Sequence, residues 1–191
     1  MHTYKDLDSF EYWSITDKDQ FSISVIKGLV MDAVRKANSG HPGGAMSSAD
    51  FIYLLFKDYL KFNPKDPDWF DRDRFILSGG HMSMLQYSIL HFTGLMKISE
   101  LKKFRQLGSL TPGHPEVEIP GVECTTGPLG QGFAMGVGMA LAEAYLSEII
   151  SNEDEDLVDH FTYVLATDGD LQEPVALGAA AIAGHLGLNK L

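Results

Sequence analysis

The sequence predicts an α/β fold with a mostly parallel sheet flanked by helices. Two short apolar segments, 74–78 and 161–166, have the length and composition of buried strands. Each is followed by a turn that contains glycine and then by a segment whose apolar residues recur at helical spacing. This repeated order of strand, turn and helix is typical of proteins with a parallel sheet.

The first helix is predicted over 17–37, where apolar residues recur every three or four positions and Thr16 is a candidate N-cap. Pro42 and the glycines of 39–44 then break it. A helix at 129–150 contains many glycines and alanines, which predicts close backbone packing against a neighbouring element. Other helices are predicted over 48–62, 82–93, 99–107 and 173–185, with connections at 63–68 and 111–126.

The composition limits the classes of partner. The 191 residues are enough for one domain, and 15 Lys and Arg against 26 Asp and Glu give a net charge of −11. Such a chain is expected to bind neither nucleic acid nor an anionic membrane. Part of the negative charge lies at Glu153–Asp156, which is interpreted as a solvated loop.

The chain has a single cysteine, Cys124, interpreted as a small packed residue and not a nucleophile. Residues 1–13 lack the apolar core of a signal peptide, and no apolar run was expected to reach membrane-spanning length. These features predict a cytoplasmic location.

Residues suited to ligand binding fall on the turns that follow the two predicted strands. Asp168 and Gly169 follow the second strand, where a carboxylate can bind a hard cation and a glycine lets a phosphate approach the backbone. The alternative is that Asp168 only caps a helix. The loop 125–132 offers backbone groups for a flat or phosphorylated ligand.

Three histidines, His41, His81 and His114, lie beside glycine or proline. If their turns converge, they form a site that handles protons or oxyanions near neutral pH. A zinc hydrolase with these histidines and Asp168 as ligands is the rival interpretation. It is disfavoured because the histidines lack the close spacing of common zinc motifs.

Four segments resemble the transketolase family in the same order along the chain, and the similarity extends over residues 17–191. They are SGHPG at 39–43, DRDRF at 71–75, TPGHPE at 111–116 and TTGPLGQG at 125–132. The resemblance implies a thiamine diphosphate (TPP)-binding fold, the pyrophosphate domain, incomplete at its C-terminus. Residues 1–16 would be an N-terminal arm, and 17–191 part of the transketolase N-terminal domain.

The resemblance also implies an activity, the transfer of a two-carbon ketol unit between sugar phosphates, for which TPP supplies the reactive carbon. His41 and His114 correspond to histidines that contact substrate, and His81 to one beside the cofactor phosphates. Asp168 corresponds to a ligand of Mg²⁺, or of Ca²⁺, and Glu173 to a carboxylate that links the cofactor sites of two subunits. The segment that meets the cofactor corresponds to Gly127, Pro128 and Leu129, and the diphosphate contact to Gly169.

The chain departs from the family pattern beside these positions. Thr167 stands where the family has glycine, and Asp170 is expected to add a negative charge beside the diphosphate. Pro174, Gly79 and Met82 are further departures.

Two family features are expected to lie outside this chain. These are a second metal ligand, an Asn on the strand that would begin near Lys190, and the domain whose Glu activates the cofactor. We therefore expect the chain alone to be inactive, and to act as a fragment or split subunit. It would work as a homodimer or with a chain that carries the pyrimidine-binding domain, or both. The alternative is a non-catalytic binding protein on a transketolase scaffold.

Overall fold

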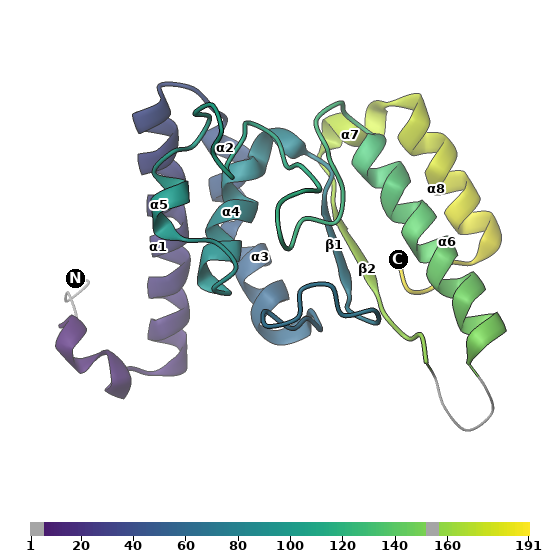
Figure 1. Ribbon diagram of the computed structural model, residues 1–191, viewed down its shortest axis with the longest axis horizontal. Coiled ribbons are helices and arrows are strands. Elements are labelled where there is room, and N and C mark those ends of the chain that lie inside the picture. Colours follow the sequence, from purple (N-terminus) through teal and green to yellow (C-terminus); the bar gives the residue numbers. More distant parts are fainter. Residues whose placement is uncertain (1–5, 152–156) are drawn as a thin grey trace.

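The computed structural model describes residues 6–151 and 157–191. It shows a small sheet with one layer of helices on each side (Figure 1). Residues 1–5 of the predicted arm and the predicted acidic loop Glu153–Asp156 lie outside the described residues. The α-helices are α1 (Ile15–Ala37), α2 (Pro42–Ser47), α3 (Ala49–Leu54), α4 (Ser83–Phe92), α5 (Ile98–Leu101), α6 (Gln131–Ile150), α7 (Asp168–Gln172) and α8 (Pro174–Leu186). The short 3-10 and π helices are η1 (Leu7–Tyr12), η2 (Leu55–Tyr59) and η3 (Gly80–Met82).

The sheet of the described residues consists of β1 (Arg74–Leu77) and β2 (Thr162–Leu165), which pair in parallel, Arg74 opposite Thr162. The predicted fold class is confirmed. Because the strands are parallel, they end at the same edge, where the Ser78 N–H donates to the Leu165 carbonyl (3.0 Å). This pairing brings the turn after β1 beside the turn after β2.

The two strands differ in burial. Residues 75–77 of β1 are buried, as predicted, whereas in β2 only Thr162 is buried and residues 163–165 are partly exposed. The prediction of a buried strand at 161–166 was therefore wrong in burial and slightly too long. On the edge of β2 away from β1, the described backbone contact is a single bond, from the Thr162 N–H to the Lys190 carbonyl (2.8 Å).

The first predicted helix is α1, but its cap is Ser14 and not Thr16. The Ser14 hydroxyl accepts from the Asp17 N–H (3.1 Å), so the helix begins at Ile15. The helix ends at Asn38, which adopts the left-handed conformation (φ 49°).

The helix predicted over 48–62 was wrong at both ends. The chain forms α2 from Pro42, then α3 after Ser48, then the π turn η2, and leaves the helix at Leu60. Pro42 begins α2, because its fixed φ and missing N–H suit the first turn of a helix, whereas α1 has already ended at Asn38. The sequence interpretation treated Pro42 only as a helix breaker and did not predict that it begins a helix.

The remaining helices lie close to their predicted positions, with two differences. The helix expected over 99–107 is only the single turn α5; residues 102–105 form turns, and Arg105 adopts a left-handed φ of 59°. The helix expected over 173–185 is preceded by the separate short helix α7, with Pro174 at the first position of α8.

The predicted close packing of α6 is confirmed. A Cβ at Gly132 would lie 2.6 Å from Ser78 Cα, and one at Gly136 would clash with Val164 of β2. Glycine at these positions lets the α6 backbone lie directly on the sheet.

By length and composition α6 is also apolar enough to cross a membrane, so the expectation that no such run exists was wrong. Many of its residues are glycine and alanine, which were interpreted by their size and not by their hydropathy. In this structure α6 packs on both strands and on α8, and its Glu143 is buried beside Lys190 (2.7 Å). These contacts use its small apolar residues within the fold.

Candidate active site

The turns that carry the predicted histidines converge. The rings of His41 and His81 lie edge to face, with centroids 5.3 Å apart. His114 lies close enough for His41 and His81 to contribute to its electrostatic environment. A Cβ at Gly127 would lie 3.6 Å from the His114 ring, which places His114 against the predicted cofactor-binding loop. One surface therefore contains groups from three separate turns.

Burial lowers the pKa of His81, and the neighbouring His41 lowers it further, although Asp170 acts in the opposite direction. Burial also lowers the pKa of His114, with additional contributions from Arg105, His41 and His81. Both imidazoles therefore favour the neutral form near neutral pH, in which one nitrogen accepts and the other donates a hydrogen bond.

The loop 125–132 lies across the exit of β1. The Thr126 hydroxyl donates to the Leu77 carbonyl (2.8 Å), and a Cβ at Gly80 would lie 2.9 Å from the Gly127 nitrogen. Glycine at position 80 is therefore required for the two turns to approach this closely.

The Asp168–Gly169 turn completes this edge. Asp168 is exposed, and its carboxylate makes no hydrogen bond or ion pair with the residues that the structure describes. A Cβ at Gly169 would lie 3.3 Å from Leu129, and one at Gly130 would lie 2.8 Å from the Glu173 Cβ. The residues expected to bind the cofactor therefore lie on adjoining turns.

Asp170 is the residue whose role the sequence interpretation missed. It was expected to add negative charge beside the diphosphate position, but it is fully buried. Its carboxylate accepts from the Gly130 N–H (2.8 Å), the Ser78 hydroxyl (3.0 Å) and the Thr167 N–H (2.8 Å). Burial alone would raise the pKa of Asp170, but these hydrogen bonds outweigh that effect and lower it. Asp170 therefore joins β1, the loop 125–132 and α7 from inside.

A signal for this role was present in the sequence. Thr167 and Asp170 stand three residues apart and form a reciprocal capping box, in which each side chain accepts from the backbone of the other. Thr167 also has an extended backbone (φ −95°), so a β-branched residue causes no strain at this turn.

The described residues offer few groups that could bind a metal ion. Within residues 6–151 and 157–191, no three His, Cys, Asp or Glu side chains are grouped so that they could hold a metal ion. This finding argues against the zinc hydrolase alternative. Asp168 is exposed, and its carboxylate is of the type that can act as one oxygen ligand of a hard cation such as Mg²⁺.

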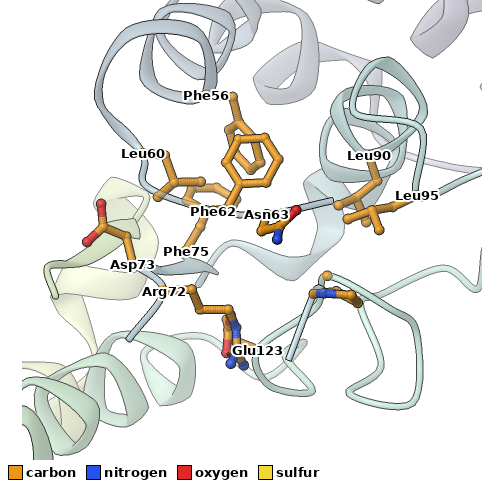
Figure 2. A pocket seen from close by; sticks show the side chains of 12 residues that line it. Phe56, Leu60, Phe62, Asn63, Arg72, Asp73, Phe75, Leu90, Leu95 and Glu123 are labelled. Atoms are coloured by element: carbon orange, nitrogen blue, oxygen red, sulfur yellow. Dashed lines mark hydrogen bonds and ion pairs between the residues drawn. The ribbon is translucent and has the colours of Figure 1, made fainter. Parts of the chain in front are cut away.

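The chain also has a small pocket away from this edge (Figure 2). Its volume is about 30 Å³, and it lies between the aromatic rings of Phe56, Phe62 and Phe75 and the ion pair of Arg72 with Glu123 (2.8 Å). Cys124 follows Glu123 in the chain. Burial raises the pKa of the Cys124 thiol to about 11, with a smaller contribution from the charge of Glu123, which agrees with a packed, unreactive thiol. A much larger open groove of about 760 Å³ adjoins His114.

Residues 18–191 match the family model described as transketolase, thiamine diphosphate binding domain. The transketolase of Staphylococcus epidermidis is 56% identical over 92% of this chain and 27% of its own length. Transketolase 2 of Escherichia coli is 57% identical over 88% of this chain and 26% of its own. The chain thus spans about a quarter of the relatives it matches.

Solved transketolases have the same fold. The Pichia stipitis enzyme, in a complex with sedoheptulose-7-phosphate, is 50% identical over 91% of this chain and 26% of its own, with a TM-score of 0.88. The enzyme from Leishmania mexicana is 48% identical over the same shares, also with a TM-score of 0.88. With the matched sequence and the matched structure in agreement, this chain belongs to the transketolase thiamine diphosphate-binding domain family.

Proposed function

We propose that this chain provides part of the TPP site of a transketolase-type enzyme, which transfers a two-carbon ketol unit between sugar phosphates. The observation that supports this most directly is that the turns after β1 and β2 meet at one edge with the loop 125–132. At that edge Gly127 and Gly169 are partly exposed, and the exposed Asp168 offers an oxygen ligand. The match to the thiamine diphosphate-binding domain of transketolase supports TPP as the ligand of this edge.

In this proposal, bound TPP supplies a nucleophilic carbon that accepts the ketol unit. Asp168 would hold Mg²⁺, or Ca²⁺, with Gly169 beside the diphosphate. His81, partly buried and neutral, would lie beside the cofactor phosphates. His41 and His114 would hydrogen-bond the substrate hydroxyl and carbonyl groups from the neighbouring turns.

The remaining parts of the proposal concern residues outside this chain. A Glu that activates the cofactor and a second metal ligand would come from a partner chain that carries the pyrimidine-binding domain. Glu173 of this chain would link the cofactor sites where two copies pair. The chain by itself would then have no transketolase activity. The cytoplasmic location stays a prediction.

The alternative of a non-catalytic scaffold was based on Thr167, Asp170 and Pro174. The structure accommodates all three, because the first two form the capping box and Pro174 begins α8. They leave the exposed carboxylate of Asp168 unchanged, so they no longer favour the alternative.

Isothermal titration of TPP into the purified chain, with and without Mg²⁺, tests the proposal. Binding should require Mg²⁺, and Asp168→Asn should weaken it by at least about tenfold, because a metal ligand is removed. Asp66→Asn makes the same charge change at an exposed turn and should leave affinity unchanged. Absence of binding at millimolar TPP, or equal affinity with and without Mg²⁺, would contradict a TPP site in this chain.

A further inference from the structure

Arg105 occupies an unusual position between two of the histidine turns. It follows α5 with a left-handed φ of 59°, a conformation that costs a residue other than glycine about 1–3 kcal/mol. The backbone N–H of Arg105 donates to the Thr111 carbonyl (2.8 Å), and this hydrogen bond closes the loop that leads to His114. The surrounding contacts must therefore offset the strain at this residue.

The Arg105 side chain contacts both turns. Its Nη1 donates to the Ser39 hydroxyl (2.8 Å), two residues before His41. Its guanidinium lies flat against Gly113, beside His114, where a Cβ would be only 3.1 Å from Nε. The Nε atom is buried against the Gly113 turn and has no hydrogen-bond partner within the described chain.

Phe104 also packs against the turn that precedes His41. A Cβ at Gly40, which has a φ of 134°, would lie 3.0 Å from the Phe104 ring. Phe104 is buried, and the Arg105 guanidinium lies 5.5 Å from the centre of its ring. The turn before His41 therefore rests on the two consecutive residues, Phe104 and Arg105.

We propose that Arg105 is a positioning residue that holds the His41 turn and the His114 turn at a fixed separation beside the open groove. Only its consequence for catalysis rests on the proposed function. A planar guanidinium can donate to Ser39 while its face packs on Gly113, whereas a lysine ammonium offers a single compact charge. The role therefore requires arginine and not only a positive charge.

The cation has a second effect, on His114. It contributes to lowering the pKa of that imidazole, together with burial and the neighbouring His41 and His81. A substitution of Arg105 that removes the positive charge should therefore raise the pKa of His114. A substitution that keeps the charge but removes the planar guanidinium should displace the turns without this rise.

These two effects can be separated by NMR on the chain itself. In Arg105→Gln, the His114 pKa should rise, and the amide signals of Ser39, Gly40 and Gly113 should shift. In Arg105→Lys the amide signals should shift in the same way, while the His114 pKa stays close to its original value. Arg35→Gln, which removes an exposed charge at the end of α1, is the matched control and should change neither.

The proposal is overturned if Arg105→Lys leaves the three amide signals unchanged, or if Arg105→Gln affects them no more than Arg35→Gln does. Should Arg105→Gln fail to fold, the lysine variant still decides. These measurements need neither TPP nor turnover. A failure here is thus distinct from a failure of the titration that tests the proposed function.

Discussion

The two helical layers of this chain are stabilised in different ways (Figure 1). The layer of α1–α5 contains the main core, with large side chains that are almost completely buried, such as Ile26, Ile52, Leu85 and Tyr87. The layer of α6 and α8 packs through glycine and alanine, and leaves large apolar side chains such as Leu177 exposed. The candidate site lies at the edge of the sheet between them. The first layer is thus stabilised by large buried side chains, and the second by close contact of its backbone with the sheet. The turns of the site depend on both layers.

The largest difference should appear when a leucine is truncated in each layer. Leu85 is fully buried in the main core, so Leu85→Ala should lower the free energy of unfolding by about 2–5 kcal/mol. Leu177 on α8 is 59% exposed, and Leu177→Ala should change it by less than about 0.5 kcal/mol. Urea denaturation measures both. Similar losses for the two variants would show that the layers are not stabilised differently.

A smaller effect is expected where the layers are joined. Asp170→Asn should lower the free energy of unfolding by about 1.5–3 kcal/mol, because the Ser78, Gly130 and Thr167 donors lose a charged acceptor. Asp168→Asn, at the exposed position of the same turn, should leave stability unchanged.

The difference between Asp170→Asn and the parent chain should depend on pH. The folded state lowers the pKa of Asp170, so its carboxylate stabilises the fold fully above the unfolded value of about 3.9. That contribution is lost as pH falls through the folded pKa. Urea titrations at pH 7 and below pH 4 should therefore show the difference shrinking in acid, and a constant difference would contradict the role of the charge.

The smallest effects concern the glycines of α6. A Cβ at Gly136 would clash with the stiff Val164, so Gly136→Ala should cost about 1–3 kcal/mol. A Cβ at Gly138 would meet nothing within 4 Å, so Gly138→Ala should stabilise the helix by about 0.5–1 kcal/mol. Thermal denaturation should show shifts of opposite sign. A stabilising Gly136→Ala would mean that α6 does not depend on close packing against β2.

The sequence was sufficient to predict the features that follow from the parallel direction of the two strands. Parallel strands end at one edge, so His81 and Asp168 could be placed near each other without a structure. It was insufficient where a residue interpreted as a helix breaker begins a new helix, as Pro42 does for α2, or where tertiary contacts override the local pattern, as in the short α5. The inward orientation of Asp170 depends on donors from Ser78 and Gly130, which lie far away in sequence. No local pattern contains that information.

The hydrogen bond between Ser78 and Asp170 has a consequence for how the chain folds. The two residues are 92 positions apart, and Gly130, which shares the same carboxylate, is 40 positions from Asp170. Closing such long loops costs conformational entropy before any contact can compensate for it. The first layer of helices can form from contacts nearer in sequence. The candidate site should therefore be among the last parts to acquire its native structure, once residues from the middle of the chain have met those of its C-terminal part.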